Sequence, residues 1–444
     1  MKTKMHLAFD LSFTHTDGRW RTAGSWAHRT YPDVSMYEDL ARIAERGCID
    51  MLFFGDGTGI PATWQNSEEV GARWGIQWPR QDMSPYITAM SRVTKHLGFG
   101  LTYASTFMPP FYVARLLNSL DLITDGRMAF NVITSTRRSD AANYGFDDLM
   151  DHNARYDRME EFVDVCKALW ASVEPDAFVW DRATGIVCDP AKVHPINHVG
   201  QFFKVRGPLN TVPSPQGRPV LIQAGGSPRG IAASAHFADL VFAAAPPRAA
   251  KIKHRQALDK ALAAKGRDPA TVGILFSTNI IVGATEQEAN AKKEALLDML
   301  PPEAVGAYLS HNIGYDFSAL PDRFSPAQVS REIAALQASP MSFVAKLAAE
   351  LGDCEMTREE FFQHGLRVAT GYDRAVTGTP AQLADFMEEE FEATGCRGGF
   401  MISHPYTTPR DMMDIIDFLI PELQRRGRFR TRYEGRTLRE NLGQ

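Results

Sequence analysis

The chain has 444 residues, of which 44% are hydrophobic and 23% charged, and its formal net charge is −5 at pH 7. This balance excludes a basic nucleic-acid-binding protein and gives no attraction to an anionic membrane surface. No apolar run approaches the roughly 18 residues of a membrane-spanning helix. The first residues lack the apolar core of a signal peptide, and the five cysteines are scattered without a CxxC pair. We therefore expect a cytoplasmic protein with free thiols.

Apolar runs with the length of buried strands alternate along the chain with amphipathic segments of helical spacing. We predict strands at residues 5–11, 48–55, 97–103, 127–134, 219–223, 240–243, 273–282 and 398–402. We predict the main helices at residues 36–46, 85–94, 110–124, 155–170, 249–265, 380–393 and 409–423. The alternation predicts an α/β protein, a single (β/α)8 TIM barrel over residues 1–444 with insertions at about 57–84, 174–212 and 301–370.

Polar residues lie at the ends of the second, third and fourth predicted strands. Asp56 follows the second strand, Thr102 ends the third, and Asn131 lies on the fourth. In βα barrels the carboxyl-terminal ends of the strands build the functional site. These three residues are therefore candidates for a site, although Asp56 could equally cap a helix or form a turn.

The turn Ala224-Gly225-Gly226-Ser227 joins the strand at residues 219–223 to a helix that begins at Pro228. Small residues let the backbone approach a ligand, and the amides at a helix start attract anions. The turn therefore suits a phosphate held by Gly226 and Ser227, with Arg229 close by. A tight strand–helix connection without a ligand remains the alternative.

Two histidine-containing pairs have the spacing of one helical face. His152 and Tyr156 stand at i and i+4 at the start of a predicted helix, so they could act together or could simply cap and pack it. His194 and His198 have the same spacing, but an intervening proline and a nearby glycine argue against a helix there, and no third ligand is evident. We therefore predict no metal site.

Four segments carry a family resemblance: TKHLGFGLT, ARLLNSLDLITDGR, FNVITS and HNARYDRMEEF. Together with further pieces downstream, they resemble the bacterial-luciferase-like flavin monooxygenases, in the branch of nitrilotriacetate and dibenzothiophene-sulfone monooxygenases. The resemblance implies that reduced FMN reacts with O2 to a C4a-hydroperoxide, which delivers one oxygen atom to a small organic substrate. It also implies a separate NAD(P)H:flavin reductase as partner and a homodimer or homotetramer.

The resemblance also assigns roles to individual residues. It implies flavin binding by Asp56 and Thr102 at the strand ends, by His152 and Tyr156 near the phosphate and ribityl chain, and by Gly226 and Ser227 at the phosphate turn. It implies catalytic positions for Asn131, near the isoalloxazine ring, and for His311, near the substrate pocket. His311 lies in residues 301–369, which suit a lid.

One departure from the family pattern concerns the general base. Some relatives carry a histidine just after the NVxT motif, where this chain has Ser135 and Thr136. No single general base is therefore assigned.

Two other functions remain open. A related group of barrels uses the deazaflavin F420 for hydride transfer, and a catalytically silent flavin-binding barrel would have a similar composition. The substrate is not specified. Trp64, Trp74, Trp78, Phe107 and Phe111 favour an apolar or aromatic molecule, although such residues are as often part of the core. The basic, turn-rich tail at residues 425–443 suggests a solvated or subunit-contacting segment.

Overall fold

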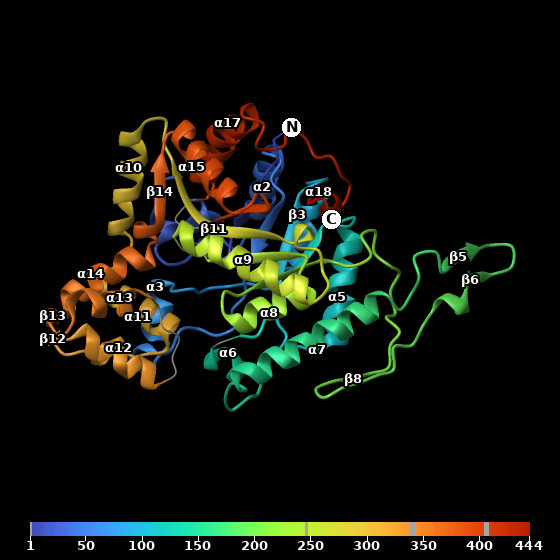
Figure 1. Ribbon diagram of the computed structural model, residues 1–444, viewed down its shortest axis with the longest axis horizontal. Coiled ribbons are helices and arrows are strands. Elements are labelled where there is room, and N and C mark those ends of the chain that lie inside the picture. The colour runs from blue at the N-terminus through green and yellow to red at the C-terminus, as the bar shows by residue number, and fades with distance from the viewer. Residues whose placement is uncertain (1, 136, 245–246, 337–341, 404–407) are drawn as a thin grey trace.

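Eight parallel strands close into a barrel in the computed structural model, which describes residues 2–135, 137–244, 247–336, 342–403 and 408–444 (Figure 1). The strands are β1 His6–Asp10, β2 Met51–Phe54, β3 Gly98–Ala104, β4 Met128–Ile133, β9 Val220–Ala224, β10 Leu240–Ala243, β11 Gly273–Val282 and β15 Gly398–Ser403. Each strand pairs with the next in this order, and β15 pairs with β1 to complete the ring. The predicted barrel is confirmed.

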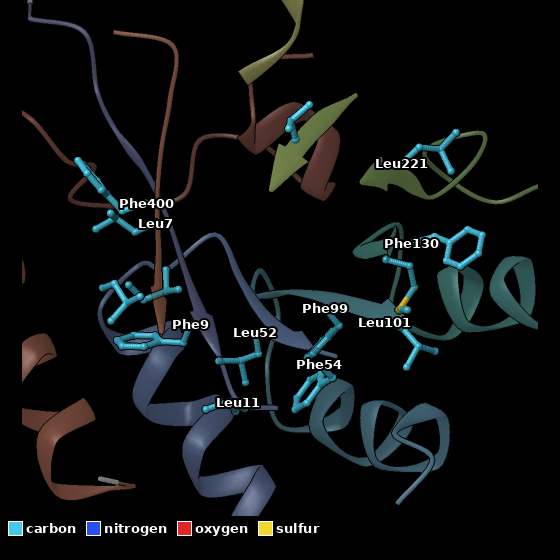
Figure 2. Close-up of a cluster of buried hydrophobic side chains, with 14 of the residues drawn as sticks. Leu7, Phe9, Leu11, Leu52, Phe54, Phe99, Leu101, Phe130, Leu221 and Phe400 are labelled. Carbon is cyan, nitrogen blue, oxygen red and sulfur yellow. The ribbon is translucent and has the colours of Figure 1, made fainter. Parts of the chain in front are cut away.

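Alternation along each strand separates an inner from an outer apolar layer. The outer layer lies between the strands and the helices, and Figure 2 shows members of it from several strands, including Leu7, Phe9, Leu52 and Phe54. A separate cluster fills the barrel interior with the intervening residues, including Ala8, Met51, Phe53, Ala129, Ile222 and Met401. Towards the carboxyl-terminal ends the same inward positions become polar, which opens that end of the barrel to chemistry.

Helices surround the barrel much as their apolar periodicity predicts. The main ones are α2 Val34–Arg46, α4 Ser84–Arg92, α5 Pro110–Ile123, α7 His152–Trp170, α8 Pro228–Phe237, α9 Arg248–Ala264 and α15 Pro380–Ala393. The predicted helix at residues 409–423 is divided into α16 Arg410–Asp414, a π-helical turn at Ile415–Leu419 and α17 Ile420–Arg425. Pro421 explains the break, because it has no backbone N–H to donate to the preceding turn.

Several short elements have too few apolar positions to show in the sequence pattern. They include α1 Ala27–Thr30, α3 Glu69–Trp74 and α6 Arg138–Asn143. By contrast, the capping pair Thr285 and Glu288 predicts the start of α10 Glu286–Glu294, and Thr285 is its N-cap. A further strand, β14 Ala375–Gly378, pairs with the second half of the long strand β11 outside the ring. None of the helices in the described part of the chain is long and apolar enough to span a membrane, and all five cysteines are free.

The segment predicted as the third insertion is helical and has its own apolar cluster. It contains α11 Pro302–Ile313, α12 Pro326–Ala335, α13 Ser342–Leu351 and α14 Arg358–Ala369, with the short pair β12 Arg323–Phe324 and β13 Met356–Thr357. Trp64 from the first insertion is buried in this cluster, and a Cβ on Gly306 would lie only 2.0 Å from its ring. Trp64 therefore packs the two insertions together as a core residue.

The segment predicted as the second insertion projects from the barrel (Figure 1). It forms two antiparallel pairs, β5 Phe178–Asp181 with β6 Ile186–Cys188 and β7 His198–Val199 with β8 Lys204–Val205. His194 Nε2 lies 2.7 Å from Glu174 and His198 Nε2 lies 2.9 Å from Glu161, so each histidine is paired with a different carboxylate.

The basic tail is not a solvated segment, because it packs against the amino-terminal end of the barrel. Leu438 and Leu442, in and beside the short helix α18 Leu438–Asn441, belong to the interior apolar cluster. The backbone N–H of Leu438 donates to the carbonyl of Gly126 at 2.9 Å. Arg430 forms an ion pair with Asp50, which is 1% exposed. The tail's arginines satisfy buried carboxylates and backbone groups, which its composition does not reveal.

Candidate functional site

The candidate residues at the strand ends form an arc over neighbouring strands of the barrel rim. Thr102 on β3 stands directly opposite Asn131 on β4, and Asn131 in turn stands opposite Ile222 on β9. Asn131 Nδ2 donates to Thr102 Oγ1 at 3.1 Å. Its Oδ1 is buried without a hydrogen-bond partner among the described residues. Such an atom costs free energy unless a ligand donates to it.

A cavity of about 350 Å³ opens beside this arc, above the ends of β2 and β3. Asp56 and Thr102 line it together, as the sequence predicts for residues at strand ends. Burial raises the pKa of Asp56, although the hydrogen bond from the Gly57 N–H and the charge of Arg80 oppose this change. The rest of the wall comes from residues 54–60, 77–78, 80–83 and 101–103, with Met108 and Tyr144.

The predicted phosphate turn lies farther along the same arc, after β9. Ser227 is the N-cap of α8, and its Oγ accepts from the Gly230 N–H at 3.0 Å. A Cβ on Gly225 would lie 2.9 Å from the Gln223 side chain and 3.2 Å from Gly230, so the turn has no room for a side chain there. A Cβ on Gly226 would have no atom closer than 3.9 Å. The backbone is thus open to a ligand at Gly226, at the positive end of the helix dipole.

His152 and Tyr156 lie together on α7, beside the start of α8. Their ring centroids are 5.1 Å apart, and the guanidinium of Arg229 lies 5.2 Å from the Tyr156 ring. Arg229 forms ion pairs with Asp157 and Glu160. Arg229 therefore lies close to the turn, as the sequence indicates, but its charge is balanced within the protein.

Two histidines lie close to Arg80, which lines the cavity. His311 on α11 is 8% exposed and its Nε2 has no hydrogen-bond partner among the described residues. Burial, together with the charges of Arg137 and Arg80, lowers the pKa of His311 to about 3. Burial likewise lowers the pKa of His15 to about 4. Both imidazoles are neutral near pH 7, so each can donate one hydrogen bond and accept another.

Sequence reasoning missed His15, Gln77, Arg80 and Arg137 as site residues. They come from loops whose paths apolar periodicity does not predict, and only the unusual pair Arg137-Arg138 after the NVIT segment gave a signal. Ser135 is buried and its hydroxyl donates to Asp140 at 3.0 Å, whereas Thr136 lies outside the described residues.

The aromatic residues that favour an apolar or aromatic substrate lie in different parts of the structure. Trp78 lines the 350 Å³ cavity, and Phe107 and Phe111 line a second cavity beneath the β7–β8 pair. Trp74 packs against the apolar cluster of the insertions, and its indole N–H donates to Glu303 at 2.9 Å. Of the five, only Trp78 adjoins Asp56 and Thr102 in the 350 Å³ cavity.

The site as a whole suits an elongated cofactor with a phosphate at one end. The arc runs from Asp56 and Thr102 through Asn131 to the open turn at Gly226 and Ser227. An unsatisfied acceptor lies in its middle and a helix N-terminus at one end. The residues present therefore fit a group with a polar ring system and a terminal phosphate.

Comparison with known proteins gives consistent matches over nearly the whole chain. Residues 9–398 match the family described as luciferase-like monooxygenases. The chain is 35% identical to the dibenzothiophene-sulfone monooxygenase of Rhodococcus erythropolis (strain XP), covering 99% of this chain and 96% of that protein. It is 35% identical to nitrilotriacetate monooxygenase component A of Aminobacter aminovorans, covering 98% and 95%. The crystal structure of a long-chain alkane monooxygenase superposes with a TM-score of 0.87 at 31% identity, covering 100% and 96%.

Proposed function

This chain belongs to the luciferase-like family of flavin-dependent monooxygenases, and from that membership we propose that it is the oxygenase component of a two-component system. It takes reduced FMN from a separate flavin reductase in the cytoplasm and inserts one atom of O2 into a small organic substrate. The observation that carries the proposal is the unsatisfied Asn131 Oδ1, which lies in line with the open phosphate turn at Gly226.

The residues of the arc have distinct roles in this proposal. Gly226 and Ser227 hold the phosphate at the N-terminus of α8, and His152 and Tyr156 cover the phosphate and ribityl chain from α7. Asp56, Thr102 and Asn131 hold the ring system. When bound, reduced FMN supplies the electrons that activate dioxygen, so that one oxygen atom enters the substrate and the other leaves as water.

The similarity to a component A supports the two-component arrangement. We expect the purified protein to oxidise no NADH by itself, because the chain takes its flavin already reduced. With FMN, a flavin reductase and candidate substrates, oxygen uptake and product formation should depend on the reductase. Anaerobic titration with reduced FMN gives an independent measure of binding. Rapid NADH oxidation by the chain alone, or binding of F420 in preference to FMN, would contradict the proposal.

His311 positions substrate or oxygen at the reacting end of the site in this proposal. Its imidazole is neutral and buried, and its Nε2 needs a partner that the protein does not supply. A hydrogen bond from this ring would orient the reacting atoms, while α11 helps to exclude water. Without it, activated oxygen should more often leave as hydrogen peroxide.

The variant His311→Ala should therefore keep its affinity for FMN but release more hydrogen peroxide per NADH consumed. The measurement is the ratio of hydrogen peroxide to product in the coupled assay. His364→Ala, on the exposed face of α14 in the same insertion, is the matched control and should leave this ratio unchanged. Because the pKa of His311 is lowered to about 3, the ratio in the unmodified protein should also be constant over roughly pH 6–8. An unchanged ratio in His311→Ala would make this histidine structural.

A further inference from the structure

Two arginines approach Gly57, a residue in the wall of the 350 Å³ cavity. Arg80 itself lines the cavity, and Arg137, just after β4, approaches Gly57 without lining the cavity. A Cβ on Gly57 would lie 2.7 Å from Arg137 Nη1 and 3.2 Å from Arg80 Nη1. Because residue 57 has no side chain, both guanidinium groups can lie close to its backbone.

Neither arginine has a carboxylate partner among the described residues. Arg137 Nη2 donates to the side-chain oxygen of Gln77 at 2.8 Å, a neutral acceptor. Arg80 lies over the Phe13 ring, and its Nε and Nη2 are buried without a hydrogen-bond partner in the described ranges of the chain. Two other buried arginines, Arg127 and Arg155, also lack a carboxylate partner in these ranges, but they donate to backbone carbonyls instead. Arg80 differs from the other described arginines because two of its side-chain nitrogens have no partner.

The carboxylates around the pair are engaged by other groups. None of them forms an ion pair with Arg80 or Arg137 in the described part of the chain. Asp17 accepts from Arg19 and the Gln77 N–H, and Asp140 accepts from Ser135 and the Thr58 N–H. The other three accept from the Gly57 N–H (Asp56), the Tyr103 hydroxyl (Asp82) and Ser12 (Asp10). The site therefore keeps cationic donors available for a ligand.

Burial and mutual repulsion both weigh against two guanidinium charges at this place. Burial lowers the pKa of Arg80 and the neighbouring charge of Arg137 lowers it further, whereas the charges of Asp56, Asp17 and Asp10 oppose this change. Burial also lowers the pKa of Arg137, against the charges of Asp140, Asp17 and Asp56. Two like charges and several buried N–H groups without acceptors all cost free energy, and a planar carboxylate between the guanidinium groups would offset each of these costs.

We propose that the substrate of this enzyme is an organic carboxylate whose anionic group is bound by Arg80 and Arg137 beside Gly57. This inference rests on the proposed function, because it assigns the substrate class of the same site. The neutral His311 adds no competing charge, and Trp78, Met83 and Tyr144 supply apolar surface for the rest of the molecule. The substrate therefore carries an anionic group, whereas the aromatic residues of the sequence alone favour an apolar or aromatic molecule.

The test is calorimetric titration of the protein, in the presence of saturating FMN, with acids and their neutral amides. Suitable pairs are benzoate with benzamide, succinate with succinamide and phenylthioacetate with its amide, and inorganic phosphate serves as a simple anion. We expect at least one acid to bind about tenfold or more tightly than its amide, as one charged hydrogen-bonded pair provides. This preference should fall below about threefold in Arg80→Gln and in Arg137→Gln.

Arg138→Gln is the matched control, because Arg138 is the neighbour of Arg137 but pairs with Asp148 at the surface. It should keep the full preference for the acid. Arg80→Lys retains the charge without the planar fork and should give an intermediate preference. FMN affinity, measured for every variant, should stay within about threefold of the unmodified protein and reports that the barrel is intact.

The outcomes separate this inference from the proposed function. If no acid binds more tightly than its amide, or if the preference survives in both glutamine variants, the inference is overturned. If both glutamine variants lose affinity for FMN but show no loss of acid preference, the arginines serve the flavin phosphate instead and the inference is again overturned. If acids bind as expected but reduced FMN does not, the anion site stands and the monooxygenase proposal fails.

Discussion

Replacing Ser227 by aspartate is expected to raise the dissociation constant of FMN by about tenfold or more, since about 1.4 kcal/mol corresponds to a factor of ten. Aspartate caps helices as well as serine does, so it should keep the hydrogen bond from the Gly230 N–H that the Ser227 hydroxyl now accepts. It would nevertheless put a negative charge at the N-terminus of α8, where the proposed function places the FMN phosphate. Fluorescence titration of the purified variant with FMN measures the effect.

The matched control is Ser227→Asn, which has nearly the same shape as aspartate and also caps helices, but carries no charge. Its affinity for FMN should be much closer to that of the unmodified protein. Equal affinities for the aspartate and asparagine variants would mean that no phosphate lies at Ser227, and the turn would then be only a strand–helix connection.

Replacing Arg430 by methionine is expected to destabilise the protein by about 3–5 kcal/mol, the usual cost of removing one partner of a buried ion pair. Asp50 lies inside the barrel's amino-terminal end, where it accepts from the Leu7 N–H at 2.7 Å and from His6 at 3.0 Å, besides Arg430. Without Arg430 its carboxylate would remain buried with too few positive neighbours. Denaturant unfolding followed by circular dichroism measures the loss.

Two controls identify the buried charge as the cause. Arg432→Met removes an exposed arginine from the same tail and should change stability little. The double variant Asp50→Asn with Arg430→Met should recover much of the loss, because it removes both charges. If the double variant is as unstable as Arg430→Met alone, packing by the arginine side chain explains the effect instead.

The same pair predicts a pH dependence. Burial alone would raise the pKa of Asp50, but Arg430, His6 and the Leu7 N–H together lower it below its ordinary value. A carboxyl group whose pKa is lowered by folding contributes stability above its unfolded pKa of about 3.9 and loses it as the pH falls through the folded pKa. The unmodified protein should therefore lose stability below about pH 4 more steeply than the double variant.

The barrel could be predicted from the sequence because its strands are short, continuous apolar runs separated by amphipathic helices. Residues such as Thr102 and Asn131 could be placed at the rim for the same reason, since parallel strands bring their carboxyl-terminal ends together. The pairing of His152 with Tyr156 follows equally from helical spacing. The periodicity of apolar residues is sufficient to place a site residue that lies on a strand or helix, or directly beside one.

The approach of two arginines to Gly57 could not be predicted in this way. Arg80 ends an insertion over residues 57–80 whose path is determined by contacts with distant segments, and Arg137 stands just after β4 in a turn of low regularity. Their convergence on Gly57 depends on the tertiary fold. The tail was misjudged for a related reason: its arginines look like surface residues until Asp50, far away in the sequence, is placed beside Arg430.

The closure of the barrel by α18 has a consequence for the order in which a nascent chain can fold. The ribosome makes all eight strands of the ring before it makes Leu438 and Leu442, which fill the interior at the amino-terminal end. A chain that has just completed β15 thus has every strand but lacks Arg430 for Asp50 and lacks the leucines that exclude solvent from the interior. Until this last segment emerges, the nascent barrel exposes apolar surface of the kind that chaperones bind.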